Sequence, residues 1–225
     1  MGKTHGHYLV FGNPQIAGRT PDADPRAMQV KWRREDGIIC EKKMLMSEGG
    51  KQSMNKVDLA CLANEDVFKL MGGDWMLVCA GKKDRFNMMT ASWGGIGWLW
   101  NRPVAFVFIR PERYTHEFVE AEERLSLSFF PEAWRDALKF CGSKSGRDFD
   151  KCKETGLSAV ELESGAVAFG EARLTLDCRK LFKASMDRSS FMDKDILAKW
   201  YSENPGGSLH DVYVVEIESV YGTKS

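Results

Sequence analysis

The sequence predicts a mainly β fold, an antiparallel barrel that is closed or nearly closed and is interrupted by helices. From Met54 onward, short runs rich in β-branched and aromatic residues recur, and tight-turn signals separate them. Strands outnumber the helical segments, and the strict strand–helix alternation of a parallel sheet is missing. These observations favour a barrel over a doubly wound sheet.

Eight segments have the composition or the alternation of strands. The alternation is clearest in "RLTLDC" and "YVVEIES", where polar and apolar side chains would point to opposite faces of the sheet. The predicted strands are residues 74–81, 86–92, 96–100, 103–109, 124–130, 159–163, 170–182 and 211–220.

Three further segments are predicted as helical excursions between the strands. Residues 115–123 and 131–142 carry apolar residues at helical spacing. Residues 193–204 begin with an Asp suited to N-capping and end before "PGG".

Residues 1–53 differ from the rest of the chain. The stretch 18–37 is rich in Pro, Gly and charge and has no sustained period, although a strand is predicted at 7–12. We therefore expect a folded domain at 54–225. Residues 1–53 would be either a poorly ordered extension or a mis-called one, that is, a segment that is not natively translated. The mis-called alternative places the translation start at Met54, because "EGGK" can be encoded by a purine-rich ribosome-binding sequence. The intact mass of natively expressed protein distinguishes the two alternatives.

The charge balance, the length of the apolar runs and the spacing of the cysteines exclude several classes of function. The chain has 225 residues, with 32 Lys and Arg against 32 Asp and Glu, so no basic field favours nucleic acid or a membrane surface. The apolar runs are too short to span a bilayer, and no secretory signal is recognisable. The six cysteines form no C-x-x-C pair, and no His lies near them at zinc spacing. We expect reduced thiols, no metal site and a cytoplasmic location.

The first candidate site is "IRPERYTHE" at 109–117, which follows a predicted buried strand and opens a helix. Arg110, Arg113, the Thr115 hydroxyl and the N–H groups at the helix start together suit a phosphate. The alternative is that both arginines pair with surface glutamates such as Glu112 and Glu117.

The second candidate site is "CGSKSGRDFDK" at 141–151. Two glycines, two serines, Lys144 and Arg147 follow a predicted helix, and loops of this composition hold anions with backbone N–H groups. The G-K-[ST] ending of a P-loop is absent. Taken alone, the segment is better explained as a solvated polar turn.

The third candidate site is the strand in "RFNMMTASWGG" at 85–95. Its small and polar side chains, followed by Gly94 and Gly95, let backbone groups approach a flat ligand with polar edges. The alternative is an ordinary barrel strand whose Thr and Ser face solvent. One face would carry Asn87, Met89, Ala91 and Trp93, and the other Met88, Thr90 and Ser92.

The sequence offers few acids, bases or nucleophiles for catalysis. No G-x-S-x-G motif is present, and His210 is only a weak candidate because a His at a strand start is more often structural. This shortage favours a cofactor that carries the chemistry itself.

Together these motifs resemble a known family. The stretch "FNMMTASWGGIGWLWNRPVAFVFIRPERYTHEFVE" at 86–120 resembles the core signature of the flavin reductase-like family, FMN-binding split-barrel flavoproteins that include flavoredoxin. The likeness continues through "LSLSFF", "GSKSGRDFDK", "FMDKDILAKWY" and "HDVYVVEI" and covers about residues 55–221, with no counterpart for residues 1–53. It implies a six-stranded antiparallel Greek-key split barrel that forms a homodimer, with one FMN per subunit near the interface.

The resemblance also implies where FMN binds. The strand would run along the isoalloxazine ring, "RPERYT" would approach the phosphate, and the "SKSG" loop would close on the phosphate or the ribityl chain. The resemblance does not decide whether Asp148 and Lys151 belong to this site or to the dimer interface. The implied FMN-binding residues are Asn87, Met88, Met89, Thr90, Ala91, Ser92, Trp93, Arg110, Arg113, Tyr114, Thr115, Ser143, Lys144, Ser145 and Gly146.

Three functions follow from the resemblance. The first is an NAD(P)H:flavin oxidoreductase, in which hydride passes from nicotinamide to flavin N5 and electrons continue to free flavin, an iron complex or an acceptor protein. The second is a flavoredoxin-like FMN electron carrier that does not use NAD(P)H directly. The third is a passive flavin or haem binder, since the fold alone does not choose between functions. Arg102, Arg113 and Trp98 could equally serve a dinucleotide phosphate, a dimer contact or a partner surface.

Overall fold

The computed structural model describes residues 15–16, 27–33, 39–45, 54–201 and 208–222, with side chains described from Met54 onward. The chain divides into two compact units, Met1–Lys51 and Gln52–Ser225, and the features of each unit are given separately below.

The first unit contains a three-stranded antiparallel sheet in the order β1 (Gln15–Ile16), β2 (Ala27–Arg33) and β3 (Ile39–Leu45). Neither β2 nor β3 is among the strands predicted from the sequence. "AMQVKWR" in β2 does alternate apolar and polar residues, but the signal is short and lies among Pro, Gly and charged residues. The strand predicted at 7–12 lies outside the described residues.

The second unit is built on one antiparallel sheet in the order β6-β5-β9-β12-β13-β8-β7, and β4 pairs with β13 beside it. This confirms the mainly β antiparallel fold, with eight strands where the resemblance implies six. The strands are β4 (Asn55–Val57), β5 (Met76–Lys82), β6 (Arg85–Ala91), β7 (Gly94–Leu99), β8 (Arg102–Ile109), β9 (Arg124–Phe129), β12 (Leu174–Ser185) and β13 (Asp211–Gly222). A separate hairpin is formed by β10 (Ala159–Glu161) and β11 (Val167–Phe169).

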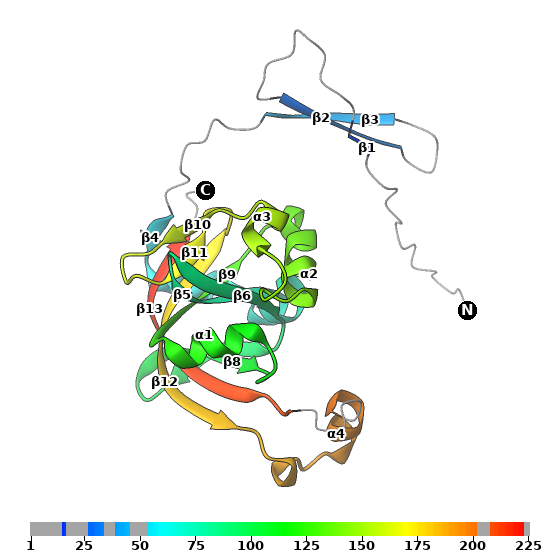
Figure 1. The fold of residues 1–225 in the computed structure, drawn as a ribbon. Coiled ribbons are helices and arrows are strands. Elements are labelled where there is room, and N and C mark those ends of the chain that lie inside the picture. The colour runs from blue at the N-terminus through cyan, green and yellow to red at the C-terminus, as the bar shows by residue number, and fades with distance from the viewer. Residues whose placement is uncertain (1–14, 17–26, 34–38, 46–53, 202–207, 223–225) are drawn as a thin grey trace, which may run out of the picture. The chain divides into compact units, whose positions relative to one another are not determined.

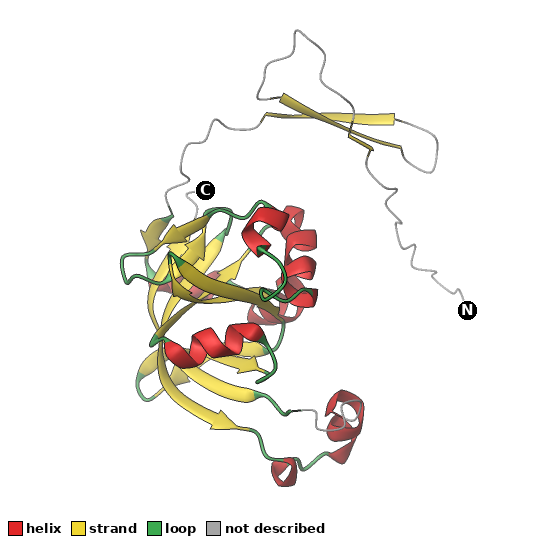
Figure 2. Cartoon of the chain, in the orientation of Figure 1, coloured by secondary structure: helices red, strands yellow, loops and turns green. Residues whose placement is uncertain are grey.

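Helical segments cover the sheet and connect its strands (Figure 2). The α-helices are α1 (Tyr114–Ala121), α2 (Arg135–Ser143), α3 (Lys151–Thr155) and α4 (Lys194–Tyr201). Shorter 3₁₀ helices span Leu59–Asn64, Glu132–Trp134 and Arg188–Ser190, and a π-helix spans Lys69–Asp74. The three predicted helices correspond to α1, to the 3₁₀ turn with α2, and to α4, while α3 and the helices before β5 are not predicted.

Strands β5 and β6 are buried on both faces. Met76 and Val78 of β5 belong to the barrel core with Phe118 of α1, whereas Leu77 and Cys79 belong to a second core beneath α2 and α3. Successive residues of a strand point to opposite faces, so two cores explain why residues 76–80 are all apolar. This double burial fixes β6 between α1 and α2.

The two longest strands, β12 and β13, extend beyond the barrel and carry α4 between their ends (Figure 1). Their pairing shifts register between Asp177 and Cys178 and again between Lys180 and Phe182. Such bulges strengthen the local twist of a strand pair and redirect it. The extension brings α4 into contact with the end of β6, through Trp200 and Trp93.

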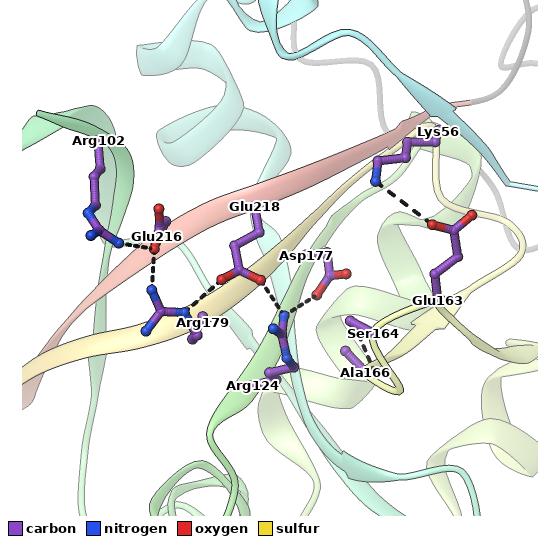
Figure 3. Close-up of polar contacts among 10 residues, drawn as sticks. All are labelled: Lys56, Arg102, Arg124, Glu163, Ser164, Ala166, Asp177, Arg179, Glu216 and Glu218. Atoms are coloured by element: carbon purple, nitrogen blue, oxygen red, sulfur yellow. Dashed lines mark hydrogen bonds and ion pairs between the residues drawn. The ribbon is translucent and has the colours of Figure 1, made fainter.

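A row of alternating charges crosses four strands on one face of the sheet (Figure 3). It runs from Arg102 of β8 to Glu216 of β13 at 2.8 Å, and from there to Arg179 of β12 at 2.5 Å. Arg179 continues it to Glu218 at 2.6 Å, and Glu218 binds Arg124 of β9, also at 2.6 Å. We refer to these five residues as the charge ladder. A network of ion pairs holds its geometry better than an isolated surface ion pair. The ladder therefore favours the observed register of β8, β13, β12 and β9.

The β7–β8 hairpin turns in two residues, since Leu99 pairs with Arg102. Trp100 and Asn101 have φ values of 52° and 56°, the left-handed backbone that a type I′ turn requires. The tight turn places the exposed side chain of Trp100 at one end of the charge ladder, beside Arg102 and Arg179.

The cysteines with described side chains are free thiols: Cys79, Cys141 and Cys178 are buried, and Cys61 and Cys152 are half-buried. No helix within the described ranges is both long and apolar enough to cross a bilayer.

Candidate functional site

A pocket of about 120 Å³ lies where β6, the start of α1 and the loop after α2 meet. The candidate segments 109–117 and 141–151 therefore face one pocket, beside the candidate strand. The lining residues are Asn87, Met89, Glu112, Arg113, Tyr114, Thr115, Gly142, Ser143, Lys144, Ser145, Gly146 and Lys151.

The start of α1 supplies a cation and a hydroxyl to the pocket. Arg113 precedes the helix and donates through a terminal nitrogen to the Gly142 carbonyl at 2.7 Å, which ties α1 to the end of α2. Burial lowers the pKa of Arg113, and Glu112 partly offsets this shift. Thr115 is buried, and its Oγ1 accepts from Asn87 Nδ2 at 2.9 Å, so the hydroxyl proton is left to donate to a ligand.

The loop after α2 is held against both neighbouring elements. A Cβ at Gly146 would lie 2.0 Å from Asn87 Oδ1, so only glycine allows the loop to approach β6 this closely. Arg147 binds the Glu117 carboxylate, and its guanidinium lies 4.5 Å from the centroid of the Tyr114 ring. Ser145 is thereby placed at the pocket, where the sequence alone favoured a solvated turn.

Lys151, at the start of α3, forms the floor of the pocket. Its ammonium donates to the Met88 carbonyl at 2.7 Å and to the Cys141 carbonyl at 2.9 Å, and the residue is only 4% exposed. Burial lowers the pKa of Lys151 to about 8, with a smaller lowering from the like charge of Arg113 and an opposing effect of Cys141.

Met88 and Thr90 point away from the pocket. The side chain of Met88 packs in the core beneath α2, and Thr90 Oγ1 donates to the Leu138 carbonyl at 2.6 Å. Along β6, therefore, the side chains of Asn87 and Met89 line the pocket, whereas those of Met88 and Thr90 secure the strand to α2.

The backbone of β6 offers a second kind of contact. Among the described strands β6 is the end of the sheet, with β5 as its one neighbour. The Met88 carbonyl faces the outer edge, where it meets Lys151, and alternate residues of an antiparallel strand direct both backbone groups to the same side. The N–H and C=O groups of Thr90 therefore face this edge too, where they can bind the polar edge of a flat ligand.

Arg110 lies outside the pocket lining and contacts α4. A terminal guanidinium nitrogen donates to the Trp200 carbonyl at 2.9 Å, and the guanidinium lies 5.2 Å from the centroid of the Tyr201 ring. A further ion pair joins it to Glu112 at 3.7 Å. Arg110 thus secures the last turn of α4, where a cation is favoured by the helix dipole.

Trp93, just beyond the end of β6, belongs to an aromatic group with α4. Its ring is 5.2 Å from that of Trp200 in an edge-to-face arrangement and 5.0 Å from that of His210. His210 Nδ1 lies 2.9 Å from the Tyr201 hydroxyl, and burial lowers the pKa of this His to about 4, with a smaller contribution from Arg110. At neutral pH the imidazole is therefore uncharged and packs as an aromatic ring. Ala91 and Ser92, half-buried, lie between the pocket and this group.

The sequence does not indicate Glu112 as a lining residue and leaves Lys151 unassigned. Gly142 is one of the two glycines of the candidate segment 141–151, although it is not among the residues that the resemblance implies. Glu112 lies inside the arginine-rich motif, where the sequence indicates only a surface partner for the arginines. Gly142 and Lys151 border the "SKSG" loop, but no periodic pattern indicates that a lysine at the start of a five-residue helix is buried.

The donors in the pocket fit a phosphate monoester. Three cationic side chains, those of Arg113, Lys144 and Lys151, surround it against one carboxylate, that of Glu112, among the described lining residues. Hydroxyl groups of Thr115, Ser143 and Ser145 add neutral donors. A ligand anchored here by a phosphate would have the open edge of β6 beside it, and the seven residues from Asn87 to Trp93 span roughly 20 Å.

One group of side chains outside the pocket has ligand atoms close enough for a metal ion. His116, Glu120 and Asp211 bring their atoms within 4.8 Å of one another. Lys183 already forms ion pairs with both carboxylates, at 2.9 Å to Glu120 and 3.0 Å to Asp211, so this group is neutralised from within the chain.

Solved structures with the same fold include several flavoproteins. An FMN-binding protein from Thermus thermophilus with bound 1-cyclohex-2-enone is 23% identical, over 67% of this chain and 71% of that chain, at a TM-score of 0.52. Flavoredoxin of Desulfovibrio vulgaris (Miyazaki F) is 19% identical, over 78% of this chain and 75% of that chain, at 0.51. An NADH:FAD oxidoreductase of Streptomyces globisporus is 13% identical, over 66% of this chain and 75% of that chain, at 0.51. Likeness at these identities shows the fold.

No curated protein matches the sequence. A family model described as flavin reductase like domain matches residues 68–224, which include the pocket and all strands from β5 to β13. This match covers more than half of the chain and confirms the family that the motifs resemble. The chain therefore belongs to the flavin reductase like domain family.

Proposed function

We propose that the protein binds FMN and acts as an NAD(P)H-dependent flavin oxidoreductase. The observation that supports FMN most directly is the pocket itself, where Arg113, Thr115 and the Ser143–Gly146 loop meet beside the open edge of β6. The phosphate would bind these groups, and the ring would lie along β6 toward Trp93.

FMN, when bound, supplies the redox chemistry, accepting hydride from a reduced nicotinamide and passing electrons to an acceptor. The protein then has to anchor the phosphate, align the ring with backbone groups of β6 and keep one ring face open. Apart from the Glu112 carboxylate, the described lining residues offer only groups that suit a phosphate or apolar and amide side chains, which is consistent with a cofactor that carries the redox chemistry. NAD(P)H as the reductant is supported by the similar fold of an NADH:FAD oxidoreductase.

The first experiment is an anaerobic visible spectrum of the purified protein, before and after NADH and then NADPH. A flavin band that bleaches promptly with one of them is the expected result and identifies the donor. A band that persists with both nucleotides but bleaches with dithionite would assign the protein as a flavoredoxin-like electron carrier instead. A protein that shows no flavin band, and acquires none from added FMN, would overturn the FMN proposal.

A homodimer is the second part of this proposal. Trp100 and Phe182 are 55% and 47% exposed, their ring centroids are 6.1 Å apart, and both line a surface depression of about 460 Å³ together with Arg102 and Arg179 of the ladder. The adjacent charge ladder alternates Arg and Glu, so the same row on a second copy, related by a two-fold axis, can place opposite charges against each other (Figure 3).

The combined Trp100→Ser and Phe182→Ser substitutions are expected to shift the protein from dimer to monomer in sedimentation equilibrium. The monomer mass is 25.4 kDa. Met192→Ser is the matched control, because Met192 is 95% exposed but lies next to α4, away from the ladder. A wild type that sediments as a monomer, or a double variant that stays dimeric, would refute this interface.

A further inference from the structure

We infer that Lys183 is a positioning residue that couples the flavin site to the arm, which we define as residues 180–201, the end of β12 together with α4 (Figure 1). Lys183 does not line the pocket, so its effect passes through α1. The inference rests on the proposed function and adds to it a control over how long the flavin stays bound.

The first argument is that a β-bulge turns Lys183 toward α1. Lys180 pairs with Val215, and Lys183 pairs with Tyr213, although the two lysines are three positions apart. Val215 and Tyr213 both belong to the barrel core, and paired residues of neighbouring strands share a face of the sheet. The register shift before Phe182 therefore brings both lysines to the face that α1 covers. Without this extra residue Lys183 would point to the opposite face.

The second argument is that Lys183 bridges carboxylates of two different elements. Its ammonium lies 2.9 Å from the Glu120 carboxylate of α1 and 3.0 Å from the Asp211 carboxylate of β13. His116 Nε2, one helical turn before Glu120, lies 2.8 Å from the Asp211 carboxylate. Burial opposes the ionisation of Asp211, but its hydrogen bonds, that from Lys183 among them, outweigh burial and lower its pKa. Asp211 is therefore anionic at neutral pH, and its side chain is 6% exposed, so the ion pair is shielded from water.

The third argument is that α1 lies between this cluster and the pocket. Thr115 of α1 lines the pocket and binds Asn87 of β6, whereas His116 and Glu120 bind the strands that carry the arm. Lys180 adds a contact to the other end of the helix, where its ammonium donates to the Glu120 carbonyl at 3.2 Å. A helix of eight residues is short enough to move as one body, so a change on one side of α1 is transmitted to the other.

The fourth argument is the place that the arm reaches. The ring of Trp200 in α4 lies 5.2 Å from that of Trp93, beyond the end of β6, and Arg110 donates to the Trp200 carbonyl at 2.9 Å. In the proposed complex the flavin ring runs along β6 toward Trp93, so the attached arm limits the space into which the ring can leave. Flavin binding and attachment of the arm then favour each other, and this coupling is reciprocal.

The first test measures the rate of flavin release by displacement in a stopped-flow fluorimeter. Lys183→Met should release FMN roughly 3- to 30-fold faster than the wild type, in keeping with the modest strength of half-exposed ion pairs. Riboflavin should be released faster by a similar factor, because Lys183 acts through the arm and not on the phosphate. Lys183→Arg keeps the charge and should restore slow release.

Lys82→Met is the matched control for the loss of a lysine ion pair to α1. Lys82 belongs to β5 and lies 3.3 Å from Glu122, the residue that follows the last turn of α1, so this variant leaves the arm untouched. It should release both flavins at the wild-type rate.

A second measurement uses the wild type alone, in case Lys183→Met does not fold. Trypsin can cleave after Lys194 and Lys199, the exposed lysines of α4, at a rate that follows local opening of the arm. Saturating FMN or riboflavin should slow both cleavages. Cleavage after the exposed Lys56 of β4, which pairs with the opposite end of β13, should not be slowed. In Lys183→Met, cleavage of α4 should be faster and the protection by flavin smaller.

Three results would overturn the coupling while leaving the FMN site intact. They are equal cleavage of α4 with and without flavin, wild-type release of both flavins from Lys183→Met, and faster release that is confined to FMN. A wild type that binds neither flavin would refute the proposed function together with this inference.

Discussion

Arg113→Ala is expected to weaken FMN binding roughly 10- to 100-fold and to leave riboflavin binding much less affected. A charge-assisted hydrogen bond contributes about 1.5–3 kcal/mol, and Arg113 is the guanidinium that lines the pocket. The measurement is the dissociation constant of each flavin by fluorescence quenching. Arg113→Lys keeps the positive charge but loses the planar guanidinium, which can form two parallel hydrogen bonds to a phosphate. This variant should therefore recover only part of the FMN affinity.

Arg110→Ala is the matched control, because the two arginines lie three positions apart and contact different elements. Arg110 binds the Trp200 carbonyl and packs on the Tyr201 ring, so its loss should loosen α4 and increase proteolysis there. We expect FMN affinity to stay within about threefold of wild type, less than one hydrogen bond to a phosphate would contribute. If Arg110→Ala lowers FMN affinity as much as Arg113→Ala does, Arg110 belongs to the phosphate site.

Gly146→Ala is expected to impair both FMN binding and stability. The new methyl group would lie 2.0 Å from Asn87 Oδ1 and 2.9 Å from its Cγ, so Asn87 or the loop has to move. Movement of Asn87 breaks its hydrogen bond to Thr115, and movement of the loop withdraws Ser145. Overpacking of this kind costs about 1–3 kcal/mol, which for a domain of this size lowers Tm by roughly 2–10 °C. Calorimetry and flavin titration of the same variant measure the two effects.

Two further variants isolate the cause. Gly72→Ala adds the same methyl group where nothing lies within 4 Å, and should leave both Tm and FMN affinity unchanged. The remaining effect of Gly146→Ala on Tm and FMN affinity should be much smaller in an Asn87→Ala background than in the wild type, because Asn87→Ala removes the obstacle and by itself already loses the contact with Thr115. A single Gly146→Ala variant with wild-type Tm and affinity would show that the loop does not approach β6 as described.

Local sequence patterns predicted most of the sheet, because strands β5 to β9, β12 and β13 each carry either a continuous apolar run or a two-residue period. β4 and α3 are not predicted because they are short. A strand of three residues and a helix of five residues do not show a hydrophobic period. Their positions depend on tertiary contacts, such as the two carbonyls that Lys151 reaches.

The sequence predicts which segments form the candidate site, but it does not predict which of their side chains face the pocket. The motifs around Arg113 and Ser145 are recognisable separately, but which arginine of "RPERYT" faces the pocket depends on where β8 ends and on α4, an element some 80 residues further on. The burial of Lys151 likewise depends on the approach of α2 to β6, which no local pattern encodes.

The position of β13 in the sheet has a consequence for biosynthesis. This strand follows β4, β8 and β12 in the chain and pairs with all three. While residues 211–222 are still inside the ribosome, β8 and β12 have no shared neighbour, and their facing edges are open to pairing with other chains. Closure of the sheet is therefore a late, long-range event. Nascent chains that stall before Asp211 should be aggregation-prone clients of chaperones, although all residues that line the pocket beside β6 have been translated by then.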